Sequence, residues 1–111
     1  MTGEEAAYLY LTTTGRSSGL ARQIEIWFVG HEGCWYLISG SYGDSDWVKN
    51  IAAQPAVQVQ IGQRSAPIIA AHGRAIDADT EPALAQAVRE RMNAKYGWSS
   101  GLIVELCPAS S

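Results

Sequence analysis

The chain has 111 residues, of which 47% are hydrophobic and 17% charged, and its formal net charge is -3. This length and composition describe one globular domain, too short for separate catalytic and cofactor domains, and the negative charge argues against a nucleic-acid partner. No apolar run approaches the roughly 20 residues of a membrane helix, and the N-terminus MTGEEAAY lacks a signal-peptide pattern, so we expect a cytoplasmic protein without a membrane span.

The first part of the chain predicts three strands separated by polar turns. Residues 8–13, YLYLTT, are β-branched and aromatic, which is typical of a strand. Residues 22–30, RQIEIWFVG, alternate with a period of two. One face of that strand carries Ile24, Ile26 and Phe28, and the other carries Glu25, Trp27 and Val29. After the turn HEG, residues 34–40, CWYLISG, complete a β-hairpin.

The middle of the chain predicts a short helix and two further strands. Residues 47–54, WVKNIAAQ, form the helix, which Pro55 ends. Residues 56–62, AVQVQIG, direct valine and isoleucine to one face and glutamine to the other. A turn then leads to a long strand over 66–78.

The last part of the chain predicts a second helix and a final strand. We expect Thr80 to be the N-cap of the helix and Pro82 to lie in its first turn. Leu84, Val88 and Met92 then form an apolar stripe, and the helix ends near Gly97. Residues 101–108, GLIVELCP, form the last strand.

Six strands and two helices in about 110 residues predict a small, mainly β antiparallel barrel with helices on its outside. Cys34 and Cys107 lie in separate strands without CxxC spacing and are interpreted as small buried residues. His31 and His72 belong to no metal-binding motif, so no metal site is expected. Residues 1–111 are therefore treated as one domain.

The loop Gly15-Arg16-Ser17-Ser18-Gly19 matches the pattern G-x-S-x-G of serine hydrolases. A nucleophile elbow needs a helix after the turn, and here a strand follows, which argues against a hydrolase. The loop also offers backbone amides, hydroxyls and a guanidinium to an anion. Composition alone does not choose between an anion-binding loop and an ordinary hairpin loop.

Three segments resemble the deazaflavin-dependent nitroreductase family, whose members are split β-barrels related to FMN-binding pyridoxamine-phosphate-oxidase-like proteins. They are LTTTGRSSGLARQIEIWFV, WVKNIAAQPAVQVQIG and KYGWSSGLIVELCP. The motifs TTTGR-x-SG-x-x-R and W-x-x-N-x-x-A-x-P-x-V-x-V carry the resemblance, which covers nearly the whole chain. It implies a six-stranded split barrel with two flanking helices, frequently a homodimer, and coenzyme F420 or FMN as the cofactor.

The resemblance also implies roles for individual residues. The cofactor phosphate would be held by Arg16, Ser17, Ser18, Gly19 and Arg22. Residues near the rest of the cofactor would be Ser39, Ser41, Trp47 and Asn50, and the alternative for Asn50 is to cap the helix. Tyr96 and Trp98 would close over the substrate. Tyr96, with Ser39 behind it, is the candidate donor to the negative charge that develops on the acceptor, and the alternative for Tyr96 is an aromatic side chain that covers the barrel mouth.

The implied activity is hydride transfer from F420 to a small quinone, nitro or enone acceptor, in which the cofactor supplies the chemistry. Trp27 is interpreted as a core or rim residue. The chain departs from the family at Ser17, where good F420 binders have lysine, and it adds Asp44 and Asp46 nearby. Two alternatives therefore stay open, which are an FMN-dependent oxidoreductase and a protein that binds a flavin or another small ligand without turnover.

Overall fold

A computed structural model describes residues 6–109 of the chain. These residues form seven strands, two α-helices and one short 3-10 turn. The strands are β1 (Leu9–Thr14), β2 (Ala21–Ile26), β3 (Val29–His31), β4 (Cys34–Ser39), β5 (Ala56–Ile61), β6 (Ile69–Ala75) and β7 (Leu102–Pro108). The helices are α1 (Asp46–Ala53) and α2 (Pro82–Tyr96), and the 3-10 turn is η2 (Tyr42–Asp44).

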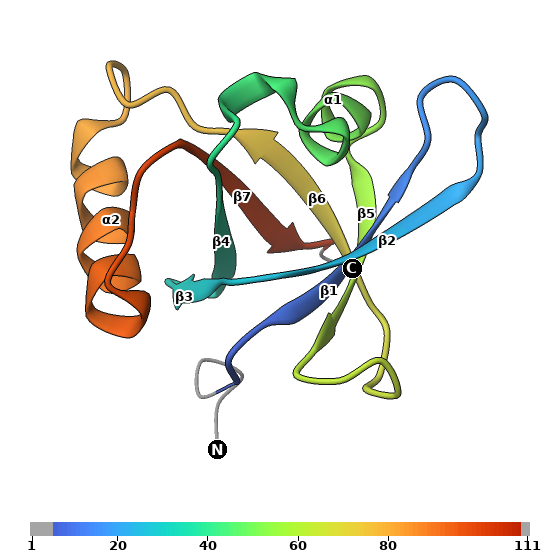
Figure 1. Ribbon diagram of the computed structural model, residues 1–111, viewed down its shortest axis with the longest axis horizontal. Coiled ribbons are helices and arrows are strands. Elements are labelled where there is room, and N and C mark those ends of the chain that lie inside the picture. The colour runs from blue at the N-terminus through green and yellow to red at the C-terminus, as the bar shows by residue number, and fades with distance from the viewer. Residues whose placement is uncertain (1–5, 110–111) are drawn as a thin grey trace.

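All seven strands belong to one antiparallel sheet in the order β2-β1-β5-β6-β7-β4-β3. The two edge strands, β2 and β3, are joined only by Trp27 and Phe28. The sheet therefore curls on itself into a half-barrel (Figure 1), with α1 packed on β1 and β6 and α2 packed on β3. The predicted split barrel with two flanking helices is confirmed.

The predicted strand over 22–30 is in fact two strands, which accounts for seven strands where the sequence predicts six. β2 pairs with β1, whereas β3 pairs with β4 on the other side of the half-barrel. At the bend between them, Phe28 is fully buried and Val29 is also buried. Phe28 belongs to the apolar cluster that Ile24 and Ile26 also contact, whereas Val29 belongs to the cluster beside α2, so the two side chains lie on opposite faces as expected.

The half-barrel has two apolar clusters. Inside the curled sheet and beneath α1, the cluster includes Leu11, Phe28 and Ile51. Gly73 on β6 permits this close packing, because an added Cβ would lie 3.1 Å from the Ile51 Cγ2 atom. A second cluster, which includes Val88 and Met92 of α2, fills the space between that helix and the sheet. Burial of these side chains is the main force that holds both helices in place.

The predicted helix stripe and its C-terminus are confirmed, but its N-cap is not. Val88 and Met92 are fully buried, and Gly97 ends α2 in the left-handed region with φ of 72°. The N-cap is Glu81 rather than Thr80. The Thr80 hydroxyl instead donates to the Asp77 carbonyl oxygen at 3.2 Å, because the preceding turn engages it.

Cys34 and Cys107 are half-buried and form a disulfide, so their interpretation as small buried residues is wrong. β4 and β7 are antiparallel neighbours with Trp35 opposite Leu106, and the next pair in that register is Cys34 with Cys107. The two cysteines are 73 residues apart in sequence, and only the pairing of the two strands brings them together. Within residues 6–109, no helix is long and apolar enough to cross a membrane.

Candidate functional site

The loop between β1 and β2 is tight because glycine stands at both of its ends. The Gly15 amide donates to the Leu20 carbonyl oxygen at 2.8 Å, and the Gly19 amide donates to that of Gly15 at 2.8 Å. A Cβ on Gly15 would lie 2.7 Å from the Ser18 Oγ atom, and Gly19 has a left-handed φ of 72°. The left-handed φ favours glycine at position 19, and a Cβ at position 15 would force the Ser18 side chain to move.

Asn50 of α1 fixes this loop to the helix. Its side chain is buried, and its Oδ1 atom accepts from the Arg16 backbone amide at 3.2 Å and from Arg16 Nη1 at 2.8 Å. The Asn50 amide nitrogen donates to the hydroxyl of Thr13 on β1 at 3.1 Å. One side chain thus sets the position of the loop, the strand before it and the Arg16 guanidinium.

The two arginines of the loop region differ in what they contact. Arg16 Nη2 donates to the Asp46 carboxylate at 3.2 Å, and Arg16 Nη1 lies 3.4 Å from the Asp46 carbonyl oxygen. Within residues 6–109, the Arg22 guanidinium makes no hydrogen bond or ion pair. Arg22 is therefore available to an anion as it stands, whereas Arg16 is held by α1.

A pocket of about 640 Å³, here called the loop pocket, lies between this loop, β2 and the start of α1. It brings together six of the predicted cofactor residues, which are Arg16, Ser17, Ser18, Arg22, Trp47 and Asn50. Trp47 is half-buried and packs against the core. Gly19 lines a neighbouring hollow on the other side of the loop. Guanidinium and hydroxyl donors in a pocket of this kind suit a phosphate or carboxylate.

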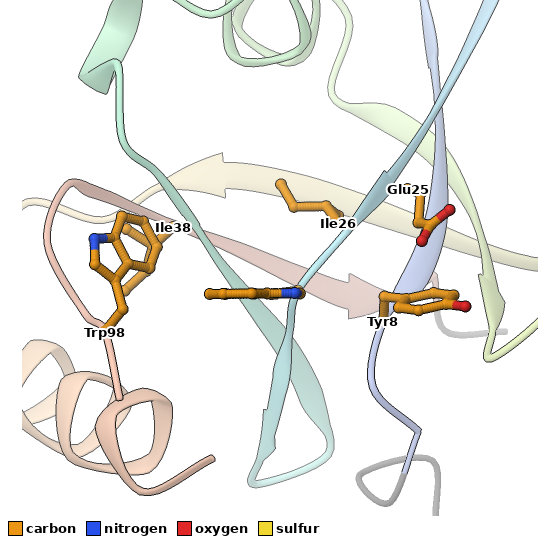
Figure 2. A pocket seen from close by; sticks show the side chains of 6 residues that line it. Tyr8, Glu25, Ile26, Ile38 and Trp98 are labelled. Atoms are coloured by element: carbon orange, nitrogen blue, oxygen red, sulfur yellow. The ribbon is translucent and has the colours of Figure 1, made fainter. Parts of the chain in front are cut away.

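A second pocket of about 270 Å³, here called the aromatic pocket, lies at the other end of β2. Its lining residues are Tyr8, Glu25, Ile26, Trp27, Ile38 and Trp98. Figure 2 shows Trp98 beside Ile38 on one side of the pocket and Tyr8 below Glu25 on the other. Flat aromatic and aliphatic walls of this type suit a planar apolar ring.

Trp27 and Tyr96 form a stacked pair at this pocket, with ring centroids 4.4 Å apart and planes 3° from parallel. The Tyr96 hydroxyl contacts the backbone carbonyl oxygens of Ala7 and Phe28 and accepts from the Phe28 amide at 3.0 Å. Burial raises the pKa of Tyr96, and its backbone hydrogen bond to Phe28 partly offsets this. Tyr96 thus holds the bend between β2 and β3 and positions Trp27.

The other two predicted serines, Ser39 and Ser41, lie apart from both pockets. Ser39 is buried at the end of β4, where its hydroxyl contacts the Tyr42 carbonyl oxygen at 2.8 Å and the Ser45 hydroxyl at 2.7 Å. Ser41 is exposed in the turn before η2. Among the described residues, neither serine lines the loop pocket or the aromatic pocket.

Strand β2 connects the two pockets. Ile24 lines the loop pocket and Ile26 lines the aromatic pocket. From Arg22 to Trp27 the chain advances about 16 Å at 3.3 Å per residue. One strand therefore carries a pocket suited to an anion and a pocket suited to a planar ring, a few residues apart.

Sequence reasoning missed most residues of the aromatic pocket. Tyr8, Ile26 and Ile38 look like ordinary strand residues, and only the curled sheet brings them together. For Trp27 a signal was present, because the period of β2 places it on the face opposite the apolar one. In the structure Trp27 lies in the bend after β2, where it is 45% exposed and lines the aromatic pocket.

Solved structures with the same fold include both cofactor-dependent and other proteins. An F420-H2 dependent reductase (FDR-A) is 20% identical, with 90% of this chain and 93% of that chain covered and a TM-score of 0.64. A proposed pyridoxamine 5′-phosphate oxidase from Listeria innocua is 14% identical, with 97% and 88% covered and a TM-score of 0.73. The haem storage protein HutZ from Vibrio cholerae is 15% identical, with 98% and 86% covered and a TM-score of 0.77.

These likenesses show the fold alone, because all three identities are low. No curated protein sequence is significantly similar to the chain. The family model for F420H(2)-dependent quinone reductases matches residues 2–101, a range that includes the loop, α1, β2 and every residue that lines the aromatic pocket. The chain therefore belongs to the F420H(2)-dependent quinone reductase family.

Proposed function

We propose that this protein is an F420-dependent oxidoreductase that transfers a hydride to a small quinone, nitro or enone acceptor. The observation that supports the proposal most is the placement of an anion-suited pocket and an aromatic pocket along one strand, β2, in a chain of this family. In this protein the residues supply position and electrostatics, and a bound reduced deazaflavin supplies the hydride.

The residues of the loop pocket fit the anionic part of the cofactor. The Arg22 guanidinium lies at the pocket without a protein partner among residues 6–109, and Ser17 is exposed beside it. We propose that Arg22 forms the main charge-assisted contact with the phosphate and that the Ser17 and Ser18 hydroxyls add weaker ones. Trp47 forms an apolar wall beside them.

The aromatic pocket fits a flat ring and the acceptor. Trp27 and Trp98 exclude water and hold flat surfaces at the reaction centre, which shortens the approach of reacting atoms to roughly 3 to 3.5 Å. The roles of Tyr96 and Ser39 as donors to the negative charge that develops on the acceptor stay predictions. The contacts of the Tyr96 hydroxyl favour a positioning role instead, because its donor already faces backbone carbonyl oxygens.

A binding titration tests the cofactor. The protein is titrated in parallel with F420 and with FMN while tryptophan fluorescence is followed, and we expect saturable quenching by F420. Arg22→Ala should weaken F420 binding by about 1.5 to 3 kcal/mol, the range for a charge-assisted hydrogen bond. Lys49→Ala is the matched control, because it removes a neighbouring exposed cation of α1 that lies outside the loop-pocket lining.

Tighter binding of FMN than of F420 would mean that FMN is the cofactor. An equal loss of F420 affinity in Arg22→Ala and Lys49→Ala would contradict the contact assigned to Arg22. A flavin bound without turnover of any acceptor would favour the non-catalytic alternative. The homodimer and the cytoplasmic location also stay predictions. The Cys34–Cys107 disulfide is a feature more typical of oxidising compartments, so the redox state of this pair in cells tests the location.

A further inference from the structure

We infer that Asp46 is a specificity-determining residue of the loop pocket: its carboxylate occupies the Arg16 guanidinium in place of the ligand's anionic group and so lowers the affinity for strongly anionic ligands. The inference rests on the proposed use of this pocket by the cofactor. Its test includes a probe that does not depend on F420.

The geometry places a carboxylate where an anion would approach Arg16. Arg16 Nη2 lies 3.2 Å from the Asp46 Oδ1 atom, while Arg16 Nη1 is held by Asn50 at 2.8 Å. Both Arg16 and Asp46 line the loop pocket. A phosphate that approaches the outer edge of this guanidinium meets the donor that Asp46 already uses.

The ion pair between Arg16 and Asp46 is open to solvent, so a ligand anion can take the place of the Asp46 carboxylate. The Asp46 side chain is 86% exposed and that of Arg16 is 37% exposed. Such a pair contributes little free energy in water, so a ligand can displace the carboxylate. The carboxylate then stays near the bound anion and repels it. A dianionic phosphate suffers this repulsion more than a monoanion does.

Asn50 holds Arg16 in the loop independently of the ion pair between Arg16 and Asp46. The neutral Asn50 side chain is buried and keeps the guanidinium in place through Oδ1, whether or not Asp46 contributes. Removing the Asp46 charge should therefore free one face of Arg16 without releasing the loop. The pocket would gain one available cation in addition to Arg22.

The test compares Asp46→Asn with Asp44→Asn. Both changes remove one negative charge from neighbouring exposed positions, but of these two aspartates only Asp46 contacts Arg16 through its side chain. Asparagine also keeps the size of the side chain at the first position of α1. Thermal melting of each variant checks that the fold is intact.

Affinity is measured for F420, for FMN and for inorganic pyrophosphate, with tryptophan fluorescence and calorimetry. We expect Asp46→Asn to bind each anion about three- to tenfold more tightly than the wild type, a gain that added salt reduces. Asp44→Asn should change affinity less than twofold. Equal affinity of Asp46→Asn and the wild type would overturn the inference, and so would an equal gain in Asp44→Asn, which would reveal a general charge effect.

The measurements with pyrophosphate and with F420 distinguish a failure of this inference from a failure of the proposed function. Tighter pyrophosphate binding by Asp46→Asn, with F420 bound by neither protein, would support the role of Asp46 and contradict the proposed cofactor. F420 binding of unchanged strength in both proteins would support the cofactor and contradict the role of Asp46.

Discussion

Replacing Asn50 with alanine should both destabilise the protein and release the loop. The Asn50 side chain makes three hydrogen bonds, two to Arg16 and one to Thr13. Thr13 is buried, so its hydroxyl loses its side-chain partner in a place that water does not easily reach. Each unsatisfied buried group costs about 1 to 3 kcal/mol.

The exposed part of the Arg16 guanidinium can turn to water, so we count the Thr13 hydroxyl and the Arg16 amide as the main losses. The free energy of unfolding should fall by about 2 to 4 kcal/mol. For a domain of this size, that loss lowers Tm by roughly 10 to 20 °C. Asn50→Ala should also weaken anion binding, because the loop then samples other positions.

Urea unfolding and thermal melting measure the effect, with Asn50→Asp and Asn93→Ala as comparisons. Asn50→Asp keeps an acceptor for Arg16 and lets the Thr13 hydroxyl donate to the new carboxylate, so it should cost less than Asn50→Ala. Asn93 is exposed on α2, and its loss should change stability by less than about 0.5 kcal/mol. An Asn50→Ala variant as stable as Asn93→Ala would refute the reasoning.

Three further changes test other parts of the fold. Reduction of the disulfide between Cys34 and Cys107 should lower the free energy of unfolding by about 4 kcal/mol, the loop-closure value for a separation of 73 residues, and unchanged urea unfolding with reductant would contradict this. Hydrogen bonds from Arg74 lower the pKa of Glu81, so its contribution is complete above the ordinary value of 4.5 and disappears as pH falls through the lowered pKa. Glu81→Gln should therefore reduce stability at neutral pH, and its Tm should fall less than that of the wild type as the pH is lowered. Tm curves of the two proteins that stay parallel at acid pH would contradict this. Gly101→Ala should cost about 2 kcal/mol or more in urea unfolding, because φ is 133° and its Cβ would lie 2.2 Å from a β4 carbonyl oxygen, and a wild-type midpoint would exclude that clash.

Local patterns in the sequence predicted most of the fold. The alternation in β5 identified its buried face, since Val57 and Val59 are buried and Gln58 is exposed. The four-residue period of α2 identified Val88 and Met92 as core residues. These predictions succeed because each depends on side chains a few residues apart, whose faces are fixed by the backbone period.

The parts of the fold that the sequence did not predict depend on pairing between strands that are distant in the chain. The bend at Trp27 and Phe28 was missed because both flanking segments favour β-structure, and only their different partners, β1 and β4, separate them. The disulfide likewise depends on the register between β4 and β7.

At the site, the motif identified Arg16 and Asn50 as neighbours of one pocket. It did not reveal that the Asp46 carboxylate pairs with the Arg16 guanidinium, because the two residues are 30 positions apart and their contact depends on where α1 begins. The same limit applies to the aromatic pocket, whose walls come from segments as distant in sequence as Tyr8 and Trp98.

The most direct test of the account is quinone-dependent oxidation of reduced F420 by the purified protein, followed by the return of the visible absorbance of oxidised deazaflavin. We predict saturable oxidation by a small neutral quinone, with a higher KM for F420 in Arg22→Ala and a lower kcat in Trp27→Ala. No oxidation above the rate without protein, in a preparation that binds F420, would contradict the proposed activity and leave a binding protein in its place.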